Sequence, residues 1–166
     1  MNNTVRLAIG KKANAADLHP IHEGNRIFKF ADDTYLIVPG VNSSTSEKEI
    51  LHLDDWAADN NLTLNRVKTK ELVLTASPKT VLPPPRPDID CVTSLRILSV
   101  VVNDKLTAAD HVTSLLSLSS SLLFAMRVLR VHGTPAASLH DVFRATVISR
   151  LQYAAPAWSG MCSAAD

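Results

Sequence analysis

The sequence has few cysteines, few aromatic residues and no long uninterrupted apolar run. Only two of its 166 residues are cysteines, Cys91 and Cys162, and they are far apart with no metal-like spacing. This pattern fits neither a disulfide framework nor a zinc site, so we expect reduced thiols in an intracellular protein, cytoplasmic or nuclear. The apolar content of 46% is typical of a globular chain, and the length suits one ordinary core.

The sequence predicts neither a signal peptide nor a membrane span. Near the start, Asn2, Arg6, Lys11 and Lys12 interrupt any apolar region. The longest apolar-looking run, from Leu115 to Met126, is broken by serines. It is also shorter than the roughly 20 apolar residues that a span requires. We therefore expect no membrane among the partners.

The net charge of +1 excludes a polycation, but the charges are unevenly distributed. Acids outnumber bases between Ala31 and Asn60, whereas four arginines accompany the single acid Asp141 between His111 and Ala165. An acidic, metal-holding end beside a basic end would suit a ligand with a phosphate backbone. Two solvated helix faces of opposite charge explain the distribution equally well.

Two adjacent carboxylates, Asp32 and Asp33, interrupt a stretch from Arg26 to Val38 that is rich in aromatic and β-branched residues. Such flanks are typical of strands, so the pattern predicts a hairpin with both carboxylates at its tip. A divalent cation such as Mg²⁺ would remove the repulsion between them. Because aspartate is also an ordinary turn residue, a solvated turn is the alternative.

The next segments predict a helix and a strand. Ile50, Leu53 and Ala57 form an apolar stripe at helical spacing, which indicates a helix over Glu47 to Asp59. Ser46 and Glu49 have the spacing of a capping box. Thr69 to Leu74 is strand-like. By contrast, Met1 to Ala16 has no clear period and is predicted to be a loop or a fraying terminus.

The second half of the chain predicts a connector, short strands and two helices. Five of the nine prolines fall between Ser77 and Asp88, which predicts a stiff, extended connector. Cys91 to Val102 is dense in valine, leucine and isoleucine and predicts one or two strands. A long amphipathic helix is expected from Thr107 or Asp110 to about Val131. A second helix should follow Gly133 and end before Pro156.

Several of these segments resemble a known family. Phe30-Ala31-Asp32-Asp33 resembles the polymerase signature of reverse transcriptases, and the run from Phe28 to Pro39 is similar to the enzymes of non-LTR (LINE-type) retrotransposons. The resemblance spans about Asp17 to Trp158, with several motifs in the same order. These motifs are Asp17-Leu18-His19-Pro20, Trp56 with Asn60-Asn61-Leu62, Leu64-Asn65 with Lys68-Thr69, Ser94 to Val100 with Asp104-Lys105-Leu106 and His111, and Arg150 to Trp158.

The resemblance implies an α+β fold, a partial polymerase palm followed by a helical thumb. Residues 1–77 would form the partial palm, a small antiparallel sheet with a packed helix and the catalytic hairpin. Residues 78–106 would form the proline-rich connector and a supporting hairpin, and residues 107–166 the thumb-like region.

It also implies the chemistry of an RNA-directed DNA polymerase, with Asp32 binding two Mg²⁺ ions and Asp33 assisting the site. Lys68 would lie near the incoming nucleotide, where it could neutralise the leaving pyrophosphate or donate a proton to it. The partners of the intact enzyme would be an RNA template, a DNA primer and deoxynucleotide triphosphates.

Two departures from the family pattern limit these expectations. Ser99 stands where the family usually has glycine, and a positive φ there would strain it. The family's third metal-binding carboxylate precedes the hairpin, but the 31 residues before Asp32 contain no recognisable equivalent. We therefore expect a fragment that is inactive by itself and associates through an exposed palm surface. The alternative is a non-catalytic remnant that at most binds nucleic acid.

Overall fold

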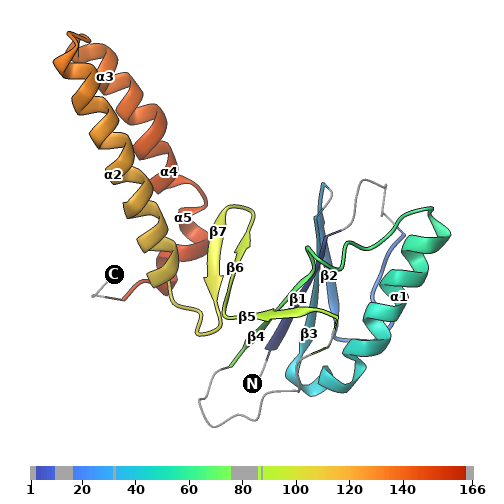
Figure 1. Ribbon diagram of the computed structural model, residues 1–166. Coiled ribbons are helices and arrows are strands. Elements are labelled where there is room, and N and C mark those ends of the chain that lie inside the picture. The colour runs from blue at the N-terminus through green and yellow to red at the C-terminus, as the bar shows by residue number, and fades with distance from the viewer. Residues whose placement is uncertain (1–2, 10–16, 32, 76–85, 87, 164–166) are drawn as a thin grey trace. The chain divides into compact units, whose positions relative to one another are not determined.

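The computed structural model describes residues 3–9, 17–31, 33–75, 86 and 88–163 (Figure 1). The chain forms two compact units. The first comprises Met1–Leu95 with Asn103–Lys105, and the second comprises Arg96–Val102 with Leu106–Asp166. Helices and small sheets together confirm the α+β class. Most of the predicted proline-rich connector, residues 76–85 and 87, lies outside the described residues.

The first unit is built on a five-stranded sheet with the order β2-β3-β1-β4-β5. The first four strands in this order pair antiparallel, whereas β4 and β5 pair parallel. The predicted sheet of the hairpin, the Thr69–Leu74 segment and part of Cys91–Val102 is thus confirmed as mainly antiparallel. Its strands are β1 (Asn3–Ile9), β2 (Arg26–Phe30), β3 (Asp33–Pro39), β4 (Lys70–Leu74) and β5 (Asp90–Val92).

Strand β1 corrects the prediction of a loop or fraying terminus over Met1 to Ala16. Asn3–Ile9 is the central strand, paired along its length with β3 and also with β4. Its sequence alternates, with Val5, Leu7 and Ile9 at every second position. This two-residue period is a strand signal that the prediction missed because the surrounding residues show none. Pairing on both sides satisfies the backbone groups of β1, which stabilises a strand of ordinary length.

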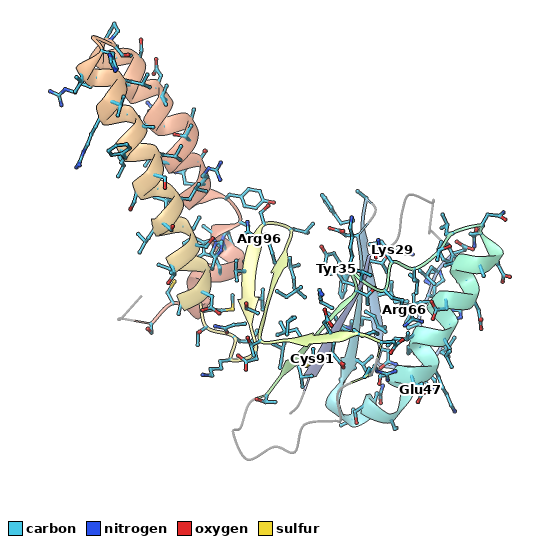
Figure 2. All side chains as sticks on the ribbon, viewed as in Figure 1. Lys29, Tyr35, Glu47, Arg66, Cys91 and Arg96 are labelled. Carbon is cyan, nitrogen blue, oxygen red and sulfur yellow. The ribbon has the colours of Figure 1, made fainter. Side chains whose placement is uncertain are left out.

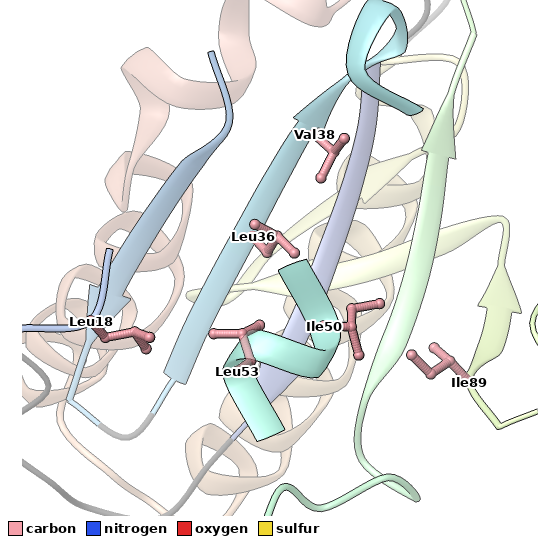
Figure 3. Packing of buried hydrophobic residues seen from close by; sticks show 6 residues of the cluster. All are labelled: Leu18, Leu36, Val38, Ile50, Leu53 and Ile89. Carbon is pink, nitrogen blue, oxygen red and sulfur yellow. The ribbon is translucent and has the colours of Figure 1, made fainter. Parts of the chain in front are cut away.

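Helix α1 (Ser46–Asp59) follows the short helix η1 (Gly40–Thr45) and confirms the predicted helix to within one residue. The apolar stripe of α1 packs against β3 on one face of the sheet. Figure 3 shows Ile50 and Leu53 of the helix beside Leu36 and Val38 of the strand. Leu18 and Ile89 complete this buried cluster. The core of the first unit therefore lies between α1 and the sheet.

The predicted capping box at the start of α1 is wrong. The residue before the helix, Thr45, makes no side-chain capping bond, and the Ser46 hydroxyl donates to the Ser43 carbonyl at 2.9 Å. The Glu49 side chain instead accepts hydrogen bonds from donors that are distant in the sequence. Glu49 is completely buried. A buried carboxylate requires hydrogen-bond donors, and here they come from another segment of the chain.

Those donors belong to the segment that leads into β2. Glu49 accepts hydrogen bonds from the backbone amides of Ile21 at 3.2 Å and His22 at 2.8 Å, and from Asn25 Nδ2 at 2.8 Å. The His22 Nδ1 atom lies 3.1 Å from Glu49 Oε1. Burial raises the pKa of Glu49, but the hydrogen bonds from Asn25, His22 and Ile21 outweigh it. The net result is a pKa below the ordinary value of 4.5.

The second unit holds most of the helices. Helix α2 runs antiparallel to a continuous helical segment of α3, η2 and α4, as Figure 1 shows. This arrangement confirms the helical hairpin predicted between Thr107 and Ala155. The helical elements of the second unit are α2 (Ala109–Val131), α3 (Ala136–Phe143), the π-helical turn η2 (Arg144–Ile148), α4 (Ser149–Gln152), α5 (Ala155–Trp158) and η3 (Ser159–Met161).

Helix α2 is longer than the apolar run that the sequence singled out. In the part of the chain that the structure describes, it is the one helix long and apolar enough to cross a membrane. Only 6% of its most apolar window is buried. Length and composition are the sole basis of this property, and a single such helix is weak evidence for a membrane span.

A two-residue turn joins β6 (Ser94–Ile97) to β7 (Val100–Asn103), which form a separate two-stranded sheet. Its central residues Leu98 and Ser99 have φ values of 45° and 71°. Two positive φ values are characteristic of the type I′ turn that favours asparagine and glycine. Ser99 therefore has the positive φ at which a residue other than glycine strains the backbone.

We predict that Ser99→Gly stabilises the protein by about 1 kcal/mol, because glycine adopts a positive φ without the steric penalty of a Cβ atom. Urea denaturation followed by circular dichroism measures the change. Ser94→Gly, made in the extended strand β6, is the matched control. It should destabilise by about 0.5–1 kcal/mol, since glycine weakens a strand. Equal effects of the two substitutions would contradict this account.

We also predict that Glu49→Gln destabilises the protein by about 2 kcal/mol at pH 7, because a neutral amide is a poorer acceptor for the buried donors. The pKa of Glu49 is lowered in the folded state, so its stabilising contribution is complete above about pH 4.5. That contribution disappears as the pH falls through the folded-state pKa. The difference in the free energy of unfolding between wild type and Glu49→Gln should therefore shrink as the pH falls through the folded-state pKa of Glu49. Glu47→Gln, an exposed change on the same helix, should show little of either effect.

Candidate functional site

The predicted hairpin forms, with β2 and β3 paired from Arg26 with Ile37 to Phe30 with Asp33. Between its strands lie two residues, Ala31 and Asp32. Asp32 itself lies outside the described residues. Ala31 has a φ of 54°, the left-handed conformation that non-glycine residues adopt rarely. The hairpin turn is thus tight, and Asp33 follows it as the first residue of β3.

Asp33 is half-buried and accepts a hydrogen bond from the Tyr35 hydroxyl at 3.1 Å. Tyr35 lies on the sheet and is labelled in Figure 2. Leu36 and Val38 point toward α1, so the alternation of the strand puts Asp33 and Tyr35 on the opposite face. The Tyr35 bond orients one carboxylate oxygen and leaves the other available to a cation or a donor.

Strand β2 forms one edge of the sheet beside this face. Phe28 pairs with Tyr35, and Phe30 pairs with Asp33. Paired residues in an antiparallel ladder share a face, so both phenylalanines lie on the face of Asp33. They are 50% and 60% exposed, respectively. The carboxylate of Asp33 therefore adjoins an exposed aromatic surface at a strand edge, the kind of surface that invites association.

Lys68 lies two residues before β4, in a turn where its backbone amide donates to the carbonyl and side-chain oxygens of Asn65, both at 3.1 Å. Its side chain is exposed. In the ladders of β1, Ile9 pairs with Asp33 and Leu7 with Lys70. Lys68, just before β4, and Asp33, at the start of β3, consequently lie at the same end of the sheet, with β1 between these two strands.

Strand β1 is the neighbour of β3 on the side away from β2, but it carries no carboxylate from Asn3 to Ile9. In the described part of the chain, no cluster of three or more histidine, cysteine, aspartate or glutamate side chains could hold a metal ion. Asp33 is thus the sole described carboxylate of the predicted metal set.

The second unit contains a feature that the sequence did not predict, a cavity of about 440 Å³. Arg96, His111 and Arg150 are among the residues that line it. They are separated by up to 54 positions (150 minus 96). No local period or motif spacing links them, so no sequence signal could have grouped these side chains.

No protein-family model, curated protein or solved structure matches this chain.

We predict that the hairpin binds Mg²⁺ weakly, with a dissociation constant in the millimolar range, equivalent to about −4 kcal/mol. Mg²⁺ retains most of its water and relies on carboxylates together with substrate phosphates. NMR titration, following the amides of Ala31 and Asp33, measures the affinity. Asp32→Asn should weaken binding further, whereas Asp55→Asn on exposed α1 should not. Micromolar binding that Asp32→Asn abolishes would reveal an additional ligand.

Proposed function

We propose that this chain is the carboxyl-terminal part of a reverse-transcriptase palm together with its thumb, of the non-LTR retrotransposon type. The intact parent would carry out RNA-directed DNA synthesis by two-metal nucleotidyl transfer. Asp32 would hold both Mg²⁺ ions and Asp33 would assist. Lys68 would neutralise or protonate the leaving pyrophosphate.

One observation carries the proposal: Asp33 opens a strand directly after a tight hairpin turn, at the same sheet end as Lys68. A carboxylate and a lysine at one end of a sheet are suited to a nucleotide's metal-bound phosphates. The sheet is mainly antiparallel and a helix covers its other face, which supports a palm-like scaffold. Phosphoryl transfer requires chiefly such positioning and charge stabilisation from the protein.

A second candidate is a non-catalytic remnant that at most binds nucleic acid, and β1 favours it for residues 1–166 by themselves. In the family that the sequence resembles, a third carboxylate on an earlier strand helps to hold the ions. Here the strand beside β3 carries none from Asn3 to Ile9. The exposed arginines Arg127, Arg130 and Arg144 on the helices would supply the cationic contacts for a phosphate backbone.

Self-association is a further part of this proposal. The exposed Phe28 and Phe30 on the edge strand β2 would be covered in a complete enzyme or by a second copy. Such a contact would remove apolar surface from water, which is favourable.

We predict that residues 1–166 by themselves do not extend a DNA primer on an RNA template. Loss of an ion's anchor removes several kcal/mol of transition-state stabilisation. A gel assay with labelled primer and Mg²⁺ tests this. An upstream palm half of the family type, joined in frame, should restore synthesis, and Asp32→Asn should then abolish it.

Two results would contradict the proposal in different ways. Primer extension by the unmodified chain that disappears with Asp32→Asn would overturn the second candidate, the non-catalytic remnant. It would also require a third carboxylate within this sequence. Failure of a folded, joined protein to synthesise DNA, with template and primer bound, would count against the polymerase origin. Asp55→Asn on the exposed side of α1 is the control and should leave the restored synthesis unchanged.

A further inference from the structure

The cavity in the second unit is bounded by the β6–β7 hairpin and by the helical hairpin of α2, η2 and α4. Arg96 of β6, labelled in Figure 2, is one of its lining residues. Its volume of about 440 Å³ is within the range of pockets that hold small organic ligands, roughly 300–1,000 Å³. All of its lining residues belong to the second unit, and none is Asp33 or Lys68.

The cavity has a positive character. Arg96 and Arg150 line it, and none of the described lining residues is acidic. Among the described residues, neither arginine forms an ion pair. Two guanidinium groups that face one cavity without a counter-ion create a local positive potential. They also present the planar donor geometry that suits oxyanions.

His111 lines the cavity as a buried polar residue. It is 97% buried, and its Nδ1 accepts the backbone amide of Val101 at 3.2 Å. Burial and the nearby Arg96 lower the pKa of His111, so the ring is neutral near pH 7. With Nδ1 as the acceptor, the hydrogen is on Nε2, and this atom has no partner among the described residues. This Nε2–H group is closed to solvent, so His111 contributes a neutral, buried ring to the lining and no charge that would oppose an anion.

The rest of the lining includes several hydroxyl groups and an apolar surface. The hydroxyls of Thr146 and Ser149 donate to the carbonyls four residues earlier, at 2.6 and 2.5 Å, so their hydrogens are already used. Leu115 and Leu118 form an apolar wall on α2. The cavity therefore combines an anion-binding side with a wall for an organic group, and it is too large for an inorganic anion alone.

We propose that this cavity binds a phosphate monoester of nucleotide size. The phosphate would contact Arg96 and Arg150, and the organic group would lie against Leu115 and Leu118. Near pH 7 a phosphate monoester carries a charge of about −1.5 to −2, which matches the two arginines, whereas a carboxylate or a phosphodiester supplies only one negative charge. The proposal does not depend on the polymerase origin.

Isothermal titration calorimetry of the full chain with adenosine 5′-monophosphate tests the proposal. We expect saturable binding with a dissociation constant of about 1 mM or lower. Inorganic phosphate should bind more weakly because it leaves the apolar wall uncovered. Adenosine should bind at least about tenfold more weakly because it lacks the charge-assisted contacts. Equal affinity for adenosine, or no binding of the monophosphate at about 10 mM, would overturn the proposal.

Substitutions then test the individual contacts. Arg96→Gln and Arg150→Gln should each weaken binding of the monophosphate by about tenfold or more. Arg26→Gln, a matched change at an exposed arginine on β2 outside the lining, should leave the affinity unchanged. An equal loss in all three variants would show general surface charge rather than a site, and would overturn the proposal. If a variant fails to fold, the comparison with adenosine on the unmodified chain decides.

A competition experiment distinguishes the source of the phosphate. Displacement of the monophosphate by a 5′-phosphorylated oligodeoxythymidylate, but not by its unphosphorylated form, would identify the end of a nucleic-acid strand as the ligand. Competition by neither oligonucleotide would identify a free nucleotide. Both results support the site. Equal competition by the two oligonucleotides would overturn it, because backbone diesters would then suffice.

Discussion

The buried carboxylate of Glu49 connects helix α1 to the segment that leads into β2. The arrangement of the first unit depends on this connection. Glu49 is completely buried on α1, and its donors, which include His22 and Asn25, belong to the segment before β2. Burial of a charge is unfavourable, but here several hydrogen bonds to one ionised group compensate for it. Because the apolar side of α1 packs on β3, the same helix positions both strands of the hairpin.

The end of the sheet that holds Asp33 shows why the candidate site is incomplete. The Tyr35 hydroxyl orients Asp33, and β1 separates Asp33 from Lys68. A strand that pairs on both sides within a sheet is a rigid support for functional side chains, but from Asn3 to Ile9 it offers no carboxylate. Among the described residues, Asp33 is therefore the one carboxylate of the predicted metal set at this end of the sheet.

In the second unit, some large apolar side chains are exposed, whereas a polar side chain on the same helix is buried. Phe124 and Val131 on α2 are 67% and 84% exposed, whereas the histidine at the base of the same helix, His111, is buried. The contact of that ring with Trp158, at 5.0 Å between centroids, and its bond to Val101 join the start of α2 to α5 and β7. His111 therefore links three elements of the second unit through one aromatic contact and one hydrogen bond.

The sequence by itself determined the elements whose signals are local: the hairpin around Asp33, helix α1 and the helical hairpin. Periodicity and turn chemistry act over a few residues, so they can be identified without a fold. Tertiary structure decided the central place of β1, since strand order depends on pairing with distant segments. It also decided the partners of Glu49, 24 to 28 residues away, which overrode a local capping pattern. The convergence of Arg96, His111 and Arg150 on one cavity was likewise decided there, because only packing brings together side chains that no sequence period relates.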